Sequence, residues 1–162
     1  DGPVDVATAT PREILSLRRS TMGYVSQFLR AVPRVATLDV VMEPALAQGL
    51  AEPEARARAE GLLTRLNVPE RLWSLPPATF SGGEQQRVNI ARGLIADVDL
   101  LLLDEPTASL DAANRAVVVD LIEAKKAAGV ALLGIFHDGD VRDRVATRIV
   151  DVSAFAPGEI AA

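Results

Sequence analysis

The sequence predicts an α/β fold in which a mostly parallel sheet is flanked by helices, and three observations carry this prediction. Apolar residues make up 49% of the 162 residues but aromatic residues only 4%, so Val, Ile, Leu and Ala must build the core, as they do in parallel sheets. Segments with the periodicity of strands alternate along the chain with segments of helical periodicity. Polar side chains stand at the ends of three predicted strands, where open parallel sheets bind ligands: Gln27, Asp104 with Glu105, and His137.

The N-terminal segment is predicted to form a strand, a helix and a second strand. Residues 4–9 alternate between apolar and polar side chains, which is typical of a half-exposed strand. Thr10 is then well placed as a helix N-cap, because Pro11 and Glu13 complete a capping box with a proline at the first helical position. This helix is expected to end near residues 18–19, and residues 22–26 are expected to form a strand that Gln27 ends.

The middle of the chain is predicted to be mostly helical. Residues 28–41 are interrupted by prolines and are expected to mix a loop with a short helix. Residues 53–66 place apolar side chains on one face of a helix, and residues 71–75 are expected to add one or two helical turns. Residues 76–77 are both proline, which favours extended backbone up to Phe80.

A second capping box begins at Ser81, and the helix that follows is expected to break at Asp97. Ser81 caps the helix and Glu84 stands three residues later. One interpretation of this pattern is simply a well-formed helix start. It also suits an anion site, because Gly82 and Gly83 leave backbone N–H groups bare at the positive end of the helix dipole.

Residues 100–103 are four consecutive leucines and are followed directly by two carboxylates, Asp104 and Glu105. The two acids could simply face water. Four leucines, each worth roughly 1.5–3 kcal/mol when buried, instead predict a central strand with a sheltered tip. Adjacent carboxylates at such a tip favour a divalent cation with oxygen ligands.

The C-terminal part repeats the alternation of helix and strand. Asp111 is the predicted N-cap of a long helix, and Gly129 is its predicted left-handed C-terminal cap. His137 is the only histidine, and at a strand end it could be no more than an ordinary polar residue. The expected elements are a helix at 112–128, a strand at 130–136, a short helix at 138–146, a last strand at 148–152 and a loose tail after Ala154.

Composition excludes several classes of function. The net charge of −5, from 17 basic and 22 acidic residues, argues against a nucleic-acid groove. The chain has no cysteine, which removes disulfides and thiolate metal sites and favours a reducing cytoplasmic location. No apolar run approaches the roughly 18 residues of a membrane span, so we expect no direct insertion into a membrane.

Three motifs resemble those of ABC-type ATPases: SGGEQQR at 81–87, LLLLDEP at 100–106 and SLD at 109–111. They are similar to the signature motif, the Walker B strand and the D-loop. The context of Gln27 is similar to the Q-loop, and His137 stands where the family has its switch histidine. The resemblance implies ATP and Mg²⁺ as cofactors and a dimer that shares its nucleotides across the interface.

The same resemblance implies a role for each matched residue. Glu105 would polarise the attacking water and His137 would contact the γ-phosphate, so these two are the implied catalytic residues. Asp104 and Gln27 would bind Mg²⁺, and Gln27 would also reach the γ-phosphate of the nucleotide. The remaining implied nucleotide-binding residues act on the ATP of the second subunit or lie at the dimer interface: Ser81, Gly82, Gly83, Glu84 and Asp111.

One family motif is absent from these 162 residues. No G-x-x-x-x-G-K-[ST] sequence occurs, and only 26 residues precede Gln27. We therefore expect an ABC-type P-loop NTPase domain that lacks its N-terminal part. In this interpretation residues 1–27 end the N-terminal core, 28–95 form a helical subdomain and 96–162 form the C-terminal core. Alone, such a chain is expected to show no meaningful ATP hydrolysis and to aggregate.

The sequence around the motifs suggests a subfamily. VSQFLR at 25–30, LNVPERLW at 66–73 and GIFHD at 134–138 resemble the ATP-binding proteins of the phosphonate carbon–phosphorus lyase system. This resemblance implies a soluble ATPase in phosphonate catabolism that pairs with a second ABC subunit and with lyase subunits. The alternative is the ATPase of an exporter-type ABC transporter, whose residues 28–41 would contact a membrane permease. A DNA-repair ATPase is disfavoured, since there is no room for a long coiled-coil insertion.

Overall fold

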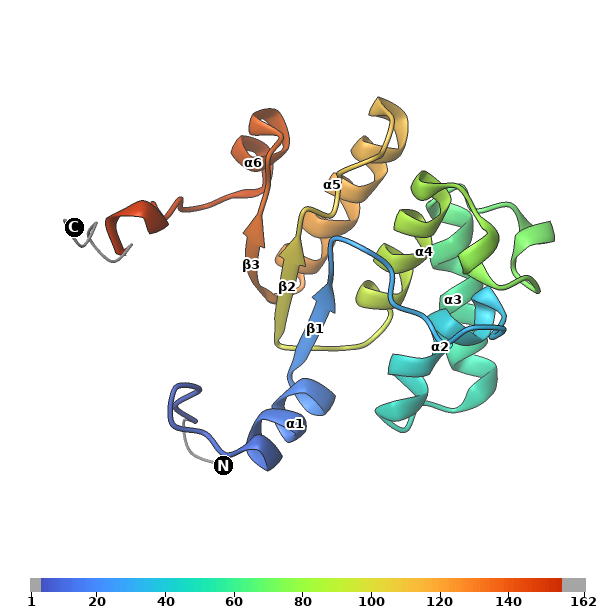
Figure 1. The fold of residues 1–162 in the computed structure, drawn as a ribbon, viewed down its shortest axis with the longest axis horizontal. Coiled ribbons are helices and arrows are strands. Elements are labelled where there is room, and N and C mark those ends of the chain that lie inside the picture. The colour runs from blue at the N-terminus through green and yellow to red at the C-terminus, as the bar shows by residue number, and fades with distance from the viewer. Residues whose placement is uncertain (1–3, 156–162) are drawn as a thin grey trace, which may run out of the picture.

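A three-stranded parallel sheet organises the computed structural model, which describes residues 4–155 (Figure 1). Within these residues the strand order is β1-β2-β3, so the leucine-rich strand is central, as the sequence predicts. The register pairs Val25 with Leu103, and Asp104 with Ile135. All three strands therefore end at the same edge. Their bounds are Met22–Val25 for β1, Leu100–Asp104 for β2 and Ala131–Ile135 for β3.

Six α-helices and three short 3-10 turns complete the described part of the chain. The helices are α1 Pro11–Ser20, α2 Thr37–Ala47, α3 Glu52–Arg65, α4 Gly82–Leu94, α5 Ala112–Ala127 and α6 Gly139–Val145. The 3-10 turns are Glu70–Leu72, Pro77–Thr79 and Val152–Phe155. Figure 1 shows α2, α3 and α4 grouped on one side of the sheet, next to β1, while α5 and α6 lie near β2 and β3. The α/β class with a parallel sheet is therefore confirmed.

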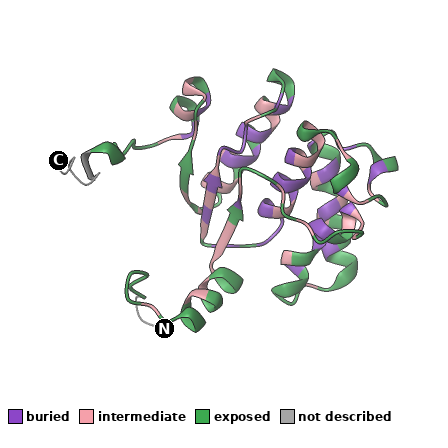
Figure 2. Cartoon of the chain, viewed as in Figure 1, coloured by how far each residue is buried: buried purple, intermediate pink, exposed green. Residues whose placement is uncertain are grey.

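The hydrophobic core runs from this helical group into the sheet. Buried residues gather on α4, α5 and β2, whereas α1 and the C-terminal segment are largely exposed (Figure 2). Helix α3 buries the face that its periodicity predicts, through Ala55, Ala59 and Leu63. The strand β2 buries Leu101 and Leu103, while Leu100 and Leu102 are only half-buried. The end of β2 therefore lies between a buried face of the sheet and a face that is partly exposed to solvent.

Helix α4 approaches β1 so closely that one position tolerates no side chain. A Cβ built on Gly93 would lie 2.4 Å from Val25 Cγ2 and 3.1 Å from the Tyr24 carbonyl oxygen. Gly23 on the strand is similarly crowded, with the Gly93 carbonyl oxygen 3.1 Å from its built Cβ. Two glycines thus set the distance between the helix and the strand, and with it the position of everything that α4 carries.

Two predicted strands are wrong, one near each end of the chain. Residues 4–9 form a turn in which the Asp5 carboxylate accepts a 3.0 Å hydrogen bond from the Ala7 N–H. Residues 148–152 are irregular until the last 3-10 turn begins at Val152, and Ile149 is 62% exposed. Alternating side chains alone do not make a strand, because each backbone N–H and C=O still needs a partner on a neighbouring strand. The predicted tail falls mostly outside the described residues.

Two predictions about prolines are also wrong. Helix α2 is longer than expected and runs through Pro44, because buried Val41, Met42 and Ala45 pack it into the helical group. Pro76 and Phe80 have the expected extended backbone, but residues 77–79 between them form a 3-10 turn, since Pro77 suits the first position of a helical turn. The expected turns at 71–75 shrink to the single 3-10 turn Glu70–Leu72.

The predicted caps are confirmed. Thr10 and Ser81 both form complete capping boxes, and the Asp111 side chain caps α5. The Asp138 side chain, which was not predicted as a cap, caps α6. Gly129 ends α5 at a φ of +89°, a conformation that favours glycine. One exposure differs from expectation, since β3 leaves Leu133 and Ile135 more than half exposed although its sequence is wholly apolar.

The loop between α4 and β2 is tied to the helical group by Asp97. Its carboxylate accepts a 2.7 Å hydrogen bond from Arg58 of α3. Its backbone exchanges two hydrogen bonds with the Gln48 side chain, which stands at the end of α2. The hydrogen bond from Arg58 is the main reason why the pKa of Asp97 lies below its ordinary value of 3.8.

We expect the Asp97→Asn variant to be slightly less stable than the wild type near neutral pH, by about 0–1 kcal/mol, because the ion pair is exposed. A lowered pKa stabilises the fold fully above the unfolded value of the carboxyl and loses this contribution as the pH falls through the folded value. The difference between variant and wild type should therefore shrink as the pH falls below the ordinary value of 3.8. Thermal melts from about pH 6 downward measure it, and a difference that grows on acidification would contradict the assignment.

Candidate functional site

The carboxyl edge of the sheet brings together the polar residues that follow the three strands. Gln27 lies two residues after β1, Asp104 ends β2 with Glu105 next to it, and His137 lies two residues after β3. Because the strands are parallel and pair Val25 with Leu103 and Asp104 with Ile135, these residues lie at one edge, as the sequence predicts.

Glu105 is the most constrained residue of this edge. Only 6% of it is exposed, and its φ of +51° lies in the left-handed region that glycine normally occupies. Its Oε2 accepts a 3.1 Å hydrogen bond from the His137 backbone N–H. Its buried Oε1 makes no hydrogen bond, although His137 Nε2 lies 3.3 Å away. A strained backbone and a free buried carboxylate oxygen are features of functional sites.

Asp104 and Gln27 face a different space from Glu105. Both line a hollow of about 1290 Å³ that extends between α1, β1, α2 and α4. The Tyr24 hydroxyl lines it too and donates a 3.1 Å hydrogen bond to Asp104 Oδ2. Desolvation, followed by this hydrogen bond, raises the pKa of Tyr24, so the hydroxyl stays protonated and remains a donor to Asp104.

Two buried amides on α4 join the loops that carry these side chains. Asn89 Nδ2 donates to the Ser26 carbonyl oxygen at 2.5 Å, next to Gln27. Gln86 Nε2 donates to the Pro106 carbonyl oxygen at 3.1 Å, next to Glu105. Neither residue is among those predicted from the sequence. Their signal is a pair of amides three positions apart on the otherwise apolar buried face of α4.

The N-terminus of α4 lies against the segment that follows Glu105. A Cβ built on Gly83 would lie 3.2 Å from the Ser109 carbonyl oxygen, whereas one built on Gly82 would meet nothing within 4 Å. Ser81 Oγ donates a 2.7 Å hydrogen bond to Glu84 Oε2, and the Ser81 N–H donates to the same oxygen at 3.0 Å. These two bonds lower the pKa of Glu84. The helix tip is thus ordered, and open to solvent on its Gly82 side.

Asp111 stands at an exposed corner just beyond this contact. Its carboxylate accepts hydrogen bonds from the Asn114 backbone, at 2.8 Å, and from the Asn114 side chain. These bonds, the backbone one first, lower the pKa of Asp111. Ser109 has a φ of +65°, which turns the segment between Glu105 and α5.

The donor atoms at this edge fit Mg²⁺ bound together with a phosphate. Among residues 4–155, no three His, Asp or Glu side chains gather as an all-protein metal site. Mg²⁺ rarely uses such a cage, because it keeps several waters and binds one or two carboxylates plus substrate phosphates. Asp104 and Gln27 offer one carboxylate and one amide oxygen beside an open hollow, which matches that requirement.

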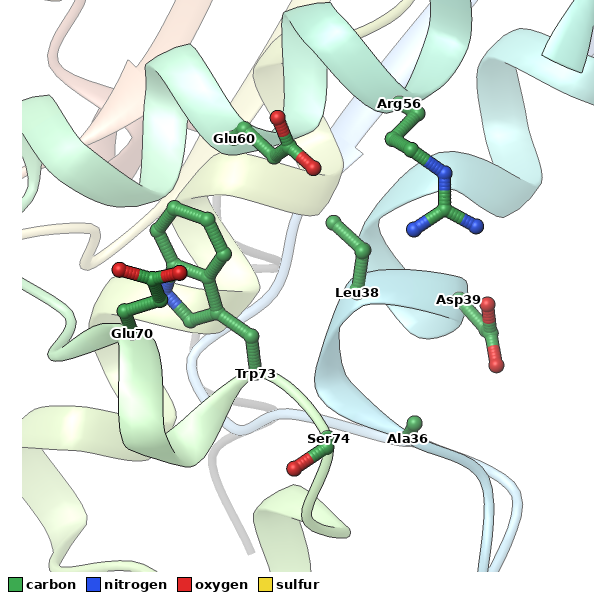
Figure 3. Close-up of a pocket in the computed structure, with 8 residues that line it drawn as sticks. All are labelled: Ala36, Leu38, Asp39, Arg56, Glu60, Glu70, Trp73 and Ser74. Carbon is green, nitrogen blue, oxygen red and sulfur yellow. The ribbon is translucent and has the colours of Figure 1, made fainter. Parts of the chain in front are cut away.

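A second, smaller hollow of about 490 Å³ lies in the helical group (Figure 3). Trp73 lines it, and its indole is fixed by a 3.0 Å hydrogen bond from Nε1 to the Val68 carbonyl oxygen. Figure 3 shows the carboxylates of Asp39, Glu60 and Glu70 around it. This hollow is separate from the sheet edge and shares no lining residue with the larger one.

A family profile described as ABC transporter matches residues 2–108, which is most of the chain. The chain belongs to the ABC transporter family. The solved structures of ABC proteins agree with this assignment. The dimeric ATP-binding cassette MJ0796, in a post-hydrolysis state bound to ADP and Pi, superposes with a TM-score of 0.79 and 28% identity over 87% of this chain and 62% of that one. The fold is therefore the ABC ATPase fold.

Curated ABC relatives include exporters. The macrolide export ATP-binding/permease protein MacB of Marinobacter nauticus is 40% identical over 156 residues, which are 96% of this chain but 23% of that protein. The lipoprotein-releasing system ATP-binding protein LolD of Syntrophus aciditrophicus is 35% identical over 90% of this chain and 66% of that protein. Within residues 4–155, no helix has both the length and the apolar character that crossing a membrane requires.

Proposed function

We propose that this ABC chain hydrolyses ATP at the carboxyl edge of its sheet, as part of an exporter-type transporter. The observation that carries the proposal is Glu105, a buried carboxylate with one unpaired oxygen, at an edge that it shares with Asp104, Gln27 and His137. ABC ATPase domains generally hydrolyse ATP. No other group of described residues combines a buried, unpaired carboxylate oxygen with further polar side chains at the ends of neighbouring strands.

Each residue of the edge has a task that its position supports. Glu105 Oε1 orients the attacking water and accepts a proton from it. His137 touches the same carboxylate and is exposed, so its imidazole can reach a γ-phosphate. Asp104 and Gln27 would hold Mg²⁺, which would neutralise phosphate charge. Gln86 and Asn89 keep the two loops at a fixed separation.

A second ABC subunit completes the site in this proposal. The N–H groups at the start of α4 have no partner within their own helix, and the positive end of the helix dipole favours an anion. Gly82 faces open space, so Ser81, Gly82 and Gly83, next to Glu84, can bind the phosphate of a nucleotide carried by another subunit. Exposed Asp111 lies beside this surface.

The exporter assignment rests on the relatives and on one exposed segment. By name, MacB is a macrolide export protein and LolD belongs to a lipoprotein-releasing system. The comparisons therefore favour the exporter alternative over a phosphonate lyase association, which they do not support. In residues 28–41, Phe28 is 71% and Val32 is 70% exposed. Leu38 and Asp39 of the same segment line the smaller hollow. We assign this surface to the permease.

The Ser81→Arg variant tests the shared site. The larger cationic side chain should block closure of two subunits and abolish hydrolysis, while ATP binding stays within about threefold, because Ser81 acts on the partner's nucleotide. The matched control is Thr10→Arg, which breaks the equivalent capping box of α1 and should leave hydrolysis intact. Both are measured in the native full-length protein by nucleotide binding and phosphate release. Hydrolysis that survives in Ser81→Arg would refute a site shared between subunits.

A further inference from the structure

Arg115 joins two segments that lie next to Glu105, one along the chain after β2 and one after β3. It lies in the first turn of α5, and its Nη1 contacts Asp138 Oδ2 at 2.8 Å. Its Nη2 donates to the Leu110 carbonyl oxygen at 3.4 Å. One guanidinium therefore bridges the segment after β2 and the segment after β3.

The Asp138 side of this bridge is rigid. The other carboxylate oxygen of Asp138 accepts hydrogen bonds from the backbone N–H groups of Asp140, at 3.0 Å, and Val141, at 3.2 Å, so it also begins α6. Asp138 follows His137 directly, and the His137 N–H is bonded to Glu105. A movement of Asp138 therefore moves His137.

The Leu110 side belongs to the connection between Glu105 and α5. Leu110 is buried, and its N–H bonds to the Thr107 carbonyl oxygen. This connection also carries Ser109, whose carbonyl oxygen lies against Gly83 at the tip of α4. Through Leu110, Arg115 therefore reaches the segment that faces a second subunit.

The guanidinium makes these two contacts at a cost. Its Nε is buried and has no hydrogen-bond acceptor, and leaving a buried donor unpaired is unfavourable. An arginine that served only solubility would turn this group to water. Arginine also suits a bridge in a way that lysine does not, because its planar fork can donate in two directions at once.

We infer that Arg115 is a positioning residue that couples His137 to the segment 107–111, so that the two move together when the site closes. Arg115 itself contacts neither water nor nucleotide in this mechanism. This inference rests on the proposed ATP hydrolysis. Loss of the Arg115 side chain should slow the catalysed step and leave nucleotide affinity unchanged.

The test compares Arg115→Gln and Asp138→Asn in the native full-length protein. Asparagine remains a good N-cap, so Asp138→Asn removes the ion pair without removing the start of α6. Each variant should lower kcat about tenfold, with KM for ATP within about twofold, since a misplacement of about 1 Å can cost up to about 100-fold. The double variant should be no slower than Arg115→Gln, because that single variant already removes the contact with Asp138.

The matched control is Arg144→Gln. It breaks an exposed 2.9 Å ion pair with Asp120 that joins the same two helices but touches neither segment, and its kcat should equal that of the wild type. Equal kcat in Arg115→Gln, Asp138→Asn and the control would overturn the inference, as would losses that multiply in the double variant. If the Glu105→Gln variant instead hydrolyses ATP as fast as the wild type, the proposed function itself is refuted. If Arg115→Gln does not fold, Asp138→Asn and Arg115→Lys carry the same comparison.

Discussion

Replacing Glu105 by glutamine is expected to lower the rate of ATP hydrolysis by about 10²–10⁴-fold, the usual contribution of a general base. Glutamine has nearly the same size and keeps an oxygen that can accept from the His137 N–H, so the local fold should persist. It cannot accept a proton from water, whereas the unpaired Glu105 Oε1 can. ATP binding should stay within about threefold of the wild type, because this carboxylate acts mainly in the transition state.

Asp99→Asn is the matched control, because its exposed carboxylate stands at the opposite end of the same strand. It should hydrolyse ATP at the wild-type rate. Phosphate release and nucleotide binding, measured on both variants of the native full-length protein, separate the two effects. A Glu105→Gln variant that retains more than about a tenth of the activity would show that another group is the base.

Gly93→Ala is expected to cause the largest loss of stability from a single methyl group. The added Cβ would lie 2.4 Å from Val25 Cγ2, and the branched Val25 side chain is stiff and fully buried. Helix α4 must therefore move away from β1, at a cost of about 1–3 kcal/mol in the free energy of unfolding. Because α4 also carries Gln86 and Asn89, the loops after β1 and β2 should separate and hydrolysis should fall.

Gly61→Ala provides the control for this substitution. Gly61 lies inside α3, and a Cβ built there meets nothing within 4 Å. Alanine should raise the free energy of unfolding by about 0.5–1 kcal/mol, since glycine weakens a helix interior. Denaturant melts of both variants measure the difference, and a Gly93→Ala variant as stable as Gly61→Ala would show that the contact between α4 and β1 is looser than described.

Features that depend on local chemistry were predictable from the sequence. The capping boxes at Thr10 and Ser81 use residues three positions apart, and Gly129 ends α5 by its own backbone freedom. The central strand follows from its leucines. The strand ends that carry Gln27, Asp104, Glu105 and His137 could be aligned because parallel strands share one carboxyl edge.

Features that depend on distant partners were not predictable. Residues 4–9 have a strand pattern but no neighbouring strand in the described sheet, and the same holds for residues 148–152. Helix α2 continues through Pro44 because burial outweighs the lost hydrogen bond. Arg115 and Asn89 join segments far apart in sequence, and periodicity says nothing about which carbonyl a side chain will reach.

The central claim is that two subunits close around ATP, with the sheet edge of one facing the α4 tip of the other. Sedimentation of Glu105→Gln with ATP and Mg²⁺ tests it most directly, because slow hydrolysis should preserve the closed state. We expect association that requires ATP and that disappears when Ser81→Arg is added. Glu105→Gln that binds ATP and stays monomeric, or association that Ser81→Arg leaves unchanged, would contradict it.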